Sequence, residues 1–430
     1  MTITRVFPIL FLVSALVWLA ASPLAAAEDG ESVLNLAIGD PARKDHEVEL
    51  LLDGITDCHT GDVIVPGDLP GKLEDVRLLL IGETHTNIDF HIAQQRIIEE
   101  LHRAGREVMV GLEMYPYTEQ KYLDQWSRNL LTEEGFLEIS DWYKNWGYPW
   151  EYYRDIFLFA RDNGLEIYAL NTPREVVRAV RQKGFDELTD DQREHVPKQI
   201  DTDSEEHVTL FKAIFAEDAD SDFHASLPEA QLRAMFNAQC TWDATMGFNA
   251  VKALREHDDP KVILVVMVGA GHLAYDLGIQ RQVQQWYDGR VASVIPIPVG
   301  DICEPVEKVQ ASYADFIWGV PPEVDPIYPS LGVSTTQDKD SGHRKVIYVA
   351  KDSPAQNAGL EMGDLLLTMD GEEIVDRAAL MSLIAGKQWG DSAEFVVSRG
   401  GESTDLHVNF RRTRPEPCED EDEEKDGGEH

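Results

Sequence analysis

Two apolar runs of this chain end in the same four-residue pattern, Gly-x-x-His. Residues 78–85 read Leu-Leu-Leu-Ile-Gly-Glu-Thr-His, and residues 265–272 read Val-Val-Met-Val-Gly-Ala-Gly-His. A continuous apolar run of this length is typical of a strand buried on both faces of a parallel sheet. In open α/β sheets, ligands bind outside the carboxyl ends of the strands. The repeated pattern therefore predicts that His85 and His272 reach one shared site.

Two further strand-like runs also end in polar residues. Residues 107–112 lead into Glu113. Residues 165–170 lead into Asn-Thr-Pro-Arg at 171–174, which ends with Arg174. Helical patterns separate the strands, at about 89–104, 118–131, 150–163, 173–183, 205–217 and 227–257. This alternation indicates an α/β domain built on a mainly parallel sheet with helices on both faces.

The polar residues at these strand ends form a chemically useful set. If the strands are assigned correctly, Glu83, His85, Glu113, Arg174 and His272 can converge at one edge of the sheet. Two imidazoles, two carboxylates and one guanidinium suit metal binding, acid–base chemistry or the capture of an anion.

Each of these residues also has a purely structural interpretation. A buried histidine is commonly hydrogen-bonded within the core, and Arg174 can belong to the first turn of a helix with Thr172 as N-cap and Pro173 at N1. A dense aromatic stretch could be either a packed helical cap or a cofactor slot. Two phenols near Glu113, Tyr115 and Tyr117, add to this set. The stretch itself consists of Trp142, Tyr143, Trp146, Tyr148, Trp150, Tyr152 and Tyr153.

The amino end has the features of a secretory signal. Arg5 forms a thin basic region, residues 7–21 are apolar, and the alanines at 25–27 offer a cleavage site. We therefore expect residues 1–27 to be a signal peptide, no lipidation cysteine at the cleavage site, and a mature protein that is periplasmic or secreted and soluble. No other run approaches membrane-spanning length.

The charge and the cysteines narrow the range of partners. A formal net charge of −40 argues against nucleic-acid or anionic-membrane partners. The residues 412–430 are strongly acidic, and we expect a solvated, disordered tail. An exported protein can form disulfides, and we expect Cys58 to pair with Cys303 because both flank the predicted α/β domain. Cys240 lies in a helical pattern and is expected to be buried.

The character of the sequence changes near residue 312. We expect the α/β domain to cover 28–312, a proline-rich linker to cover 313–329, and a small β-rich domain to cover 330–411. The last segment resembles a bacterial PDZ domain through Ser-Pro-Ala at 353–355, Ala-Gly-Leu at 358–360, Gly-Asp at 363–364 and Asp-Gly at 370–371.

The PDZ resemblance implies the binding of a peptide or protein C-terminus by strand addition. The carboxylate-binding loop of that family maps onto Ser330, Leu331, Gly332 and Val333. Use of the fold for intramolecular docking alone is the other possibility. The chain has no Gly-x-Ser-x-Gly pattern, which disfavours a serine protease.

The main domain resembles the ChaN-like proteins, within the group that includes Tiki, TraB and the erythromycin esterases. The two Gly-x-x-His motifs carry the resemblance together with Gly-Leu-Glu-Met at 111–114, Asn-Thr-Pro-Arg at 171–174 and three polar helix positions, His91, Gln239 and Asp243. His91 also shares a helical face with Gln95, and Gln239 shares one with Asp243. The similarity spans about residues 50–300.

The resemblance implies two different functions. ChaN-like proteins are linked to haem binding and iron uptake, whereas Tiki relatives hydrolyse peptides with a metal and the esterase relatives activate water with a His and Glu pair. The first implies haem as cofactor, and the second implies a divalent metal. Haem needs an axial His or Tyr, an apolar slot and a cation for its propionates.

We therefore expect an exported ChaN-like protein that binds haem or iron, followed by a PDZ domain. The ligand-binding candidates are His85, His91, Arg174, Gln239, Asp243 and His272. The alternative is a metal-dependent peptidase or esterase, with Glu83, His85, Glu113 and His272 as catalytic residues and the metal on His85, His272 and Glu113. A non-catalytic PDZ scaffold is the third possibility.

Overall fold

The computed structural model describes residues 32–217, 228–300, 307–322 and 326–411. The chain forms two compact units, a larger one that runs to Pro326 and a smaller one that starts at Ile327. The predicted signal peptide at 1–27, the acidic tail at 412–430 and Cys303 lie outside the described residues. Within the described residues, no helix combines the length and the apolar character needed to cross a membrane.

The larger unit is built on a sheet with the strand order β3-β2-β10-β8-β4-β7-β5-β6. The run from β10 to β6 is parallel throughout, and β2 and β3 extend it in antiparallel fashion. The strands are β2 (Ile55–Asp57), β3 (Val63–Ile64), β4 (Val76–Glu83), β5 (Glu107–Pro116), β6 (Glu166–Asn171), β7 (Val262–Gly269), β8 (Arg290–Pro298) and β10 (Phe316–Val320). A separate antiparallel pair joins β1 (Glu47–Glu49) and β9 (Lys308–Gln310).

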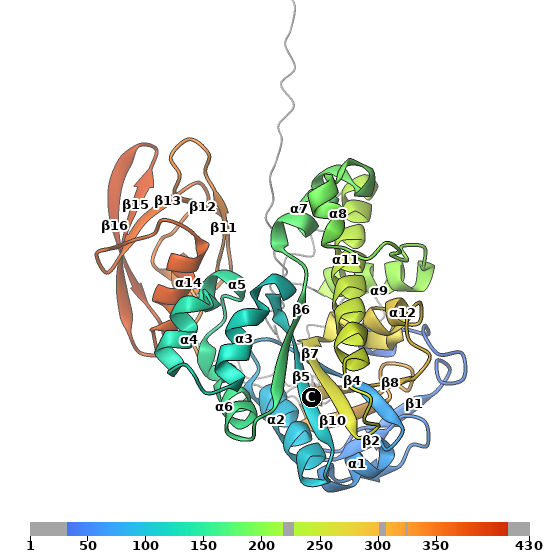
Figure 1. Ribbon diagram of the computed structural model, residues 1–430. Coiled ribbons are helices and arrows are strands. Elements are labelled where there is room, and N and C mark those ends of the chain that lie inside the picture. Colours follow the sequence, from blue (N-terminus) through green and yellow to red (C-terminus); the bar gives the residue numbers. More distant parts are fainter. Residues whose placement is uncertain (1–31, 218–227, 301–306, 323–325, 412–430) are drawn as a thin grey trace, which may run out of the picture. The chain divides into compact units, whose positions relative to one another are not determined.

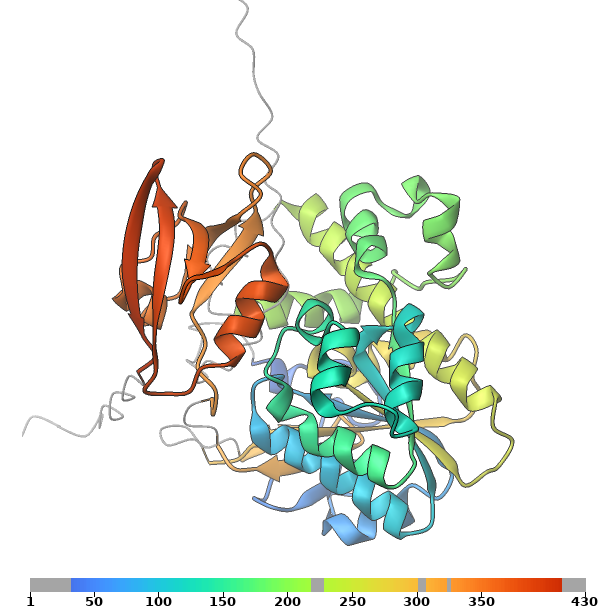
Figure 2. The ribbon, with the colours of Figure 1, turned by 60° about the vertical axis from the view of Figure 1, so that its left-hand side comes forward.

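Helices cover both faces of this sheet, as predicted, with α2 and α6 on one face and α11 and α12 on the other (Figures 1 and 2). The helices are α1 (Leu69–Lys72), α2 (Ile88–Arg103), α3 (Gln120–Ser127), α4 (Glu133–Ile139), α5 (Trp142–Asn145), α6 (Arg154–Asp162), α7 (Arg174–Lys183), α8 (Asp190–Glu194), α9 (Glu205–Glu217), α11 (Glu229–Arg255) and α12 (Ile279–Val283).

The central strands are buried because they are apolar on both faces. All residues of β7 are buried, and alternate residues of β4, Leu78 and Leu80, pack into one core with Met246 of α11 and Ile279 of α12. Burying a side chain of this size stabilises the fold by about 1.5–3 kcal/mol. Packing rather than helix propensity therefore holds the helices against the sheet.

The boundary between the two units differs from the prediction. Residues 316–320, expected to belong to a linker at 313–329, form β10 and pair with β8 and β2 inside the sheet. The segment reads Phe-Ile-Trp-Gly-Val, and all five residues are buried. Burial of these apolar residues favours a strand here, although the sequence that follows is rich in proline. The α/β unit thus extends beyond residue 312.

The smaller unit is a mainly antiparallel sheet with two helices. Its elements are β11 (Val333–Gln337), β12 (Arg344–Val349), α13 (Pro354–Asn357), β13 (Leu365–Met369), β14 (Glu372–Glu373), α14 (Arg377–Ala385), β15 (Ser392–Arg399) and β16 (Glu402–Asn409). β11 and β16 are the outer strands of the order β11-β12-β13-β15-β16. Phe395 and Val397 of β15 pack with Leu380 of α14 in its core.

Both described cysteines carry buried free thiols. Cys240 lies in α11 and is buried, as predicted. Cys58 follows β2, and its thiol lies 3.8 Å from the carbonyl oxygen of Thr56. Cys58 is thus a free thiol in the structure, and Cys303, its expected partner, lies outside the described residues. Burial raises the pKa of the Cys58 thiol to about 12, which keeps it protonated and unreactive.

Candidate functional site

Glu83 is the centre of a buried hydrogen-bonded cluster at the carboxyl end of β4. Its Oε1 accepts hydrogen bonds from Tyr153 at 2.6 Å and from His85 Nδ1 at 2.8 Å, and its Oε2 accepts one from Gln94 at 2.7 Å. His91 Nδ1 lies 3.7 Å from the same Oε2. Four side chains thus hold one carboxylate, which is only 1% exposed.

The surroundings of Glu83 keep it ionised. Burial alone raises the pKa of a carboxyl group, but the charges and hydrogen bonds of His91, His85 and Tyr153 outweigh it and lower the pKa of Glu83 to about 2. The sequence suggested a helical face shared by His91 and Gln95. In the structure His91 bonds Gln94, at 3.0 Å, whereas Gln95 bonds Glu99.

His272 lies between two carboxylates at the end of β7. Its Nδ1 is 2.5 Å from Asp243 Oδ1 and 2.8 Å from Gln239 Nε2, and its Nε2 is 3.4 Å from Glu113 Oε1. The second oxygen of Glu113 accepts a hydrogen bond from the amide of Gly269 at 2.8 Å. Asp243, predicted as a ligand-binding residue, therefore accepts a hydrogen bond from His272 and orients it from α11, and Gln239, predicted likewise, lies beside it on the same helix.

This geometry makes His272 an imidazolium at neutral pH. Burial lowers the pKa of a histidine, but Glu113 and Asp243 outweigh that effect and raise the pKa of His272 to about 10. The pKa of Glu113 is lowered, against the effect of burial, chiefly by the charge of His272. A protonated imidazole donates hydrogen bonds and cannot accept a proton, so His272 is no general base here.

The two clusters meet at Gly269, where β4 and β7 run side by side. Glu83 pairs with Gly269 in the parallel register. A Cβ at Gly269 would lie 3.1 Å from His85 Cε1 and 3.7 Å from Glu113 Oε2. The Trp146 ring covers His85 edge-on, with centroids 4.7 Å apart. The structure thus brings together Glu83, His85, Glu113 and His272, and Gly269 leaves little free space beside His85.

A metal site needs three or more donors that point at one place. Within residues 32–217, 228–300, 307–322 and 326–411, no group of three His, Cys, Asp or Glu residues is placed to hold a metal ion. The carboxylates bond to imidazole nitrogens instead of converging with them. The predicted metal set of His85, His272 and Glu113 is therefore not found.

Arg174 is the first residue of α7, and Pro173 rather than Thr172 is its N-cap. The Thr172 hydroxyl donates instead to the carbonyl of His195, at 3.0 Å. The Arg174 guanidinium donates to the main-chain carbonyl of Asn145. Its predicted role in neutralising an anionic ligand stays a prediction.

The two phenols near Glu113 have different environments because Tyr115 lies within β5, whereas Tyr117 begins the short 3-10 helix that follows the strand. Tyr115 is fully buried, and its hydroxyl is 2.7 Å from Ser140 Oγ. Tyr117 follows β5, is half-buried, and its hydroxyl lies 2.7 Å from His195 Nδ1. Hydrogen bonds through Asn171 and Thr172 link this pair to the backbone of Glu113.

The aromatic stretch mostly forms a packed cap. Trp142, Trp150 and Tyr153 are buried, and Trp142 packs edge-on against the other two, with ring centroids 5.0 and 5.6 Å apart. Phe157 of α6 also contacts Trp142 and Trp150. The cap serves the site by holding the Tyr153 hydroxyl against Glu83.

Sequence reasoning missed several partners of the site. Gln94 and Tyr153 bond Glu83, and behind Asp243 lie His207 and Arg281, with Arg281 Nη2 3.1 Å from His207 Nδ1. His207 Nε2 lies 3.8 Å from Asp243 Oδ2. Burial and Arg281 lower the pKa of His207 to about 3. Tyr153 was named only as part of the aromatic stretch, and Gln94, His207 and Arg281 stand in no motif, so only the fold identifies these residues as partners of the site.

Comparison with known proteins gives two domain matches. Residues 69–283, half of the chain, match the family of haem-binding uptake proteins of the Tiki superfamily, ChaN. Residues 329–410 match the PDZ domain. A solved structure of cofacial haem binding to ChaN of Campylobacter jejuni is 18% identical, with a TM-score of 0.48, and covers 62% of this chain and 98% of its own.

Two related sequences each match one part of the chain. The serine protease Do-like HtrA of Lactobacillus helveticus is 32% identical over 65 residues, which are 15% of this chain and 16% of that protein. Protein RETICULATA-RELATED 5, chloroplastic, of Arabidopsis thaliana is 25% identical over 129 residues, 28% of this chain and 17% of that protein. The chain thus spans about a sixth of the length of either relative. The chain belongs to the ChaN family of haem-binding uptake proteins in the Tiki superfamily, and it carries a PDZ domain after the family domain.

Proposed function

We propose that this protein is an exported haem-binding protein of iron uptake, whose PDZ domain binds the C-terminus of a partner. The haem would lie at the carboxyl edge of the parallel sheet. The observation that carries this proposal is the pair formed by Tyr117 and His195, which joins a half-buried phenol to an imidazole at 2.7 Å. Family membership supports the choice of haem.

Tyr117 is better placed than the neighbouring phenols to serve as the axial ligand of the haem iron. Haem iron in proteins is held by side chains that include His and Tyr. The hydroxyls of Tyr115 and Tyr153 are buried and already bonded to Ser140 and Glu83. Tyr117 retains exposed surface, so a flat ligand could reach it without opening the core.

His195 gives the phenol a way to become anionic. Burial, with a smaller effect from Glu194, raises the pKa of Tyr117, so the free protein keeps the phenol protonated. Haem supplies an iron that binds an anionic oxygen. His195 Nδ1 lies at hydrogen-bonding distance and could accept the phenolic proton, and Arg174 could pair with a propionate.

An optical titration of the mature protein with haemin tests this assignment. We expect a saturable Soret shift, and a rise in Kd of at least tenfold for Tyr117→Phe. Tyr122→Phe is the matched control, because Tyr122 is also half-buried and lies only five residues away. Unchanged binding by Tyr117→Phe would refute the ligand. Unchanged binding after replacing both His85 and His272 would remove those residues from the site.

A metal-dependent hydrolase is less well supported. The described residues hold no group of three metal donors, and the raised pKa of His272 makes it unsuited to accept a proton. Turnover of peptides or esters that stops with a chelator and returns with a divalent ion would reinstate that alternative. If neither haemin nor metal binds but peptide does, the protein acts as a scaffold.

Two features support peptide binding by the PDZ domain. β11 is an outer strand and so can accept an added strand. The carbonyls of Leu331 and Gly332 accept hydrogen bonds from the amides of Ala355 and Ala350. Because C=O and N–H point in opposite directions in a trans peptide, the next two amides, of Gly332 and Val333, point away from those partners and could face a carboxylate.

Gly332 is the residue to change. Its φ is +78°, and a Cβ there would lie 2.2 Å from the Cβ of Ser353. We expect Gly332→Ala to abolish the anisotropy increase of a labelled peptide that ends in valine. The control is Gly371→Ala, at φ +85° with no atom within 4 Å of the added Cβ. Equal binding of the same peptide with an amidated end would refute carboxylate recognition.

A further inference from the structure

The turn that follows His272 is held in an unfavourable backbone conformation. Tyr275 and Asp276 both adopt positive φ, at 60° and 59°, although neither is glycine. Two consecutive left-handed residues of this kind persist only when their surroundings impose them. A Cβ at Gly278 would lie 2.0 Å from the carbonyl oxygen of His272, so the turn folds directly back onto His272.

The amino-terminal segment from Val33 to Arg43 forms hydrogen bonds with Tyr275, the first left-handed residue of this turn. The hydroxyl of Tyr275 donates to the carbonyl of Val33 at 2.7 Å and accepts a hydrogen bond from the amide of Leu36 at 2.9 Å. Tyr275 is 1% exposed, so no water replaces these partners. A Cβ at Gly39 would lie 2.9 Å from the Tyr275 carbonyl oxygen, so the backbone of the segment packs against the turn.

Arg43 forms an ion pair with Asp276, the second left-handed residue of the turn. Its Nη2 lies 3.3 Å from Asp276 Oδ2 and 3.2 Å from Asp315 Oδ1, and its Nε lies 2.8 Å from Asp40 Oδ2. Its Nη1 donates to the carbonyls of Ala311 and Ala314. The side chain of Arg43 is only 7% exposed and that of Asp315 only 9%, whereas Asp40 and Asp276 keep about a third of their side-chain surface exposed. The guanidinium therefore ties the segment, the turn and the loop before β10 together.

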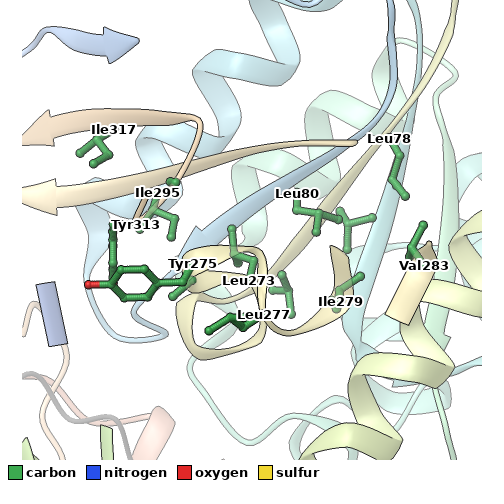
Figure 3. Close-up of a cluster of buried hydrophobic side chains, with 14 of the residues drawn as sticks. Leu78, Leu80, Leu273, Tyr275, Leu277, Ile279, Val283, Ile295, Tyr313 and Ile317 are labelled. Carbon is green, nitrogen blue, oxygen red and sulfur yellow. The ribbon is translucent and has the colours of Figure 1, made fainter. Parts of the chain in front are cut away.

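The turn and the amino-terminal segment also pack into the same hydrophobic core. Figure 3 shows Leu273, Tyr275 and Leu277 along the turn, with Tyr313 and Ile295 beside them. The Tyr275 and Tyr313 rings meet edge-on with centroids 5.2 Å apart, and the amide of Tyr275 donates to the carbonyl of Tyr313. Val33, Leu36 and Ile38 of the segment belong to the same hydrophobic cluster.

We propose that residues 33–43 are a positioning strap, which holds the turn 273–277 and through it sets His272 against Glu113 at the ligand site. Residues 33–43 lie outside residues 69–283, the region that matches the family. This inference rests on the proposed function in one respect: a weakened strap reduces ligand affinity only if His272 contributes to binding. In this proposal Tyr275 and Arg43 are positioning residues that act through His272.

The test uses Tyr275→Phe in the mature protein, since it keeps the ring and removes both hydrogen bonds to the strap. Tyr168→Phe is the matched control, because the Tyr168 hydroxyl also has two partners, Glu166 and His257, near the start of β6. If Tyr275→Phe fails to fold, Asp276→Asn replaces it, because this change keeps the shape and weakens the Arg43 contact.

Two measurements on the ligand-free protein judge the strap directly. We expect Tyr275→Phe to speed amide hydrogen exchange at least tenfold in residues 273–278 and 33–43, and to shift the ¹⁵N signals of the His272 ring at one fixed pH. Tyr168→Phe should change neither. Unchanged exchange and unchanged ring signals would overturn the proposal, whether or not the protein binds haem.

A haemin titration then separates positioning from general stabilisation. We expect Tyr275→Phe to raise Kd at least threefold, and to have less than half that effect in the His272→Asn background. An equal effect in both backgrounds would overturn action through His272. If no variant binds haemin, the proposed function fails, and the exchange and ring-signal measurements still decide the strap.

Discussion

Glu83→Gln tests how much the buried carboxylate contributes to stability. The pKa of Glu83 is about 2 against an ordinary 4.5, because His91, His85 and Tyr153 outweigh the effect of burial. At 1.36 kcal/mol per pKa unit, this difference corresponds to about 3 kcal/mol of folding free energy. Glu83 is 1% exposed, so solvent screening does not reduce this value.

The sign of the pH dependence follows from the lowered pKa. The folded state binds the Glu83 proton more weakly than the unfolded state does, so the contribution is complete above about pH 4.5 and is lost as the pH falls towards 2. The gap between the unfolding free energies of wild type and Glu83→Gln should therefore shrink from about 3 kcal/mol at pH 5 to about 1.5 kcal/mol at pH 3.

Urea unfolding followed by tryptophan fluorescence measures this gap. Trp389 is the only tryptophan of the PDZ segment 329–410, so the signal reports mainly on the α/β unit. Glu99→Gln controls for the loss of one charge from the same region, since Glu99 lies on α2. Parallel loss of stability by wild type and Glu83→Gln between pH 5 and pH 3 would refute the reasoning.

Three further predictions concern other parts of the fold. Trp126→Ala should cost about 3–5 kcal/mol in urea unfolding, since Trp126 is fully buried in the aromatic cap; a loss under 1 kcal/mol would contradict this packing. Arg399→Ala should destabilise the PDZ unit by about 1–2 kcal/mol, because it leaves the buried carboxylate of Asp364 without its ion pair; hydrogen exchange of the amides in β13 and β15 at increasing urea measures this loss. Cys58 and Cys240 should resist alkylation in the folded protein and react in urea, since burial raises the pKa of both thiols; peptide mass mapping reads this out, and rapid labelling of either would refute it.

Local sequence patterns predicted the central strands and most of the long helices of this fold, but not β8 or β10. The apolar run at 78–81 lies within β4 and the run at 265–268 within β7, and the helical pattern at 205–217 coincides with α9. These patterns succeed because a strand buried on both faces, or a helix with one apolar face, needs a residue period that local sequence displays. The PDZ motif worked for the same reason, since its turns need glycine at fixed positions, such as Gly371 at φ +85°.

The site depended on information that no local pattern contains. β7 inserts between β4 and β5, which sets Gly269 beside Glu83 and brings His272 to Glu113 across 159 positions of the chain. Tyr153 reaches Glu83 across 70 positions.

The sequence by itself determined that this chain forms a parallel α/β domain with polar residues at its strand ends, followed by a PDZ domain. Only the tertiary structure decided that Glu83 pairs with His85 and Glu113 with His272, and that Tyr117 keeps exposed surface while Tyr115 does not. The physical reason is that strand order and side-chain burial follow from packing across the whole core. A residue's chemistry is visible in the sequence, whereas its partners are set by contacts between distant segments.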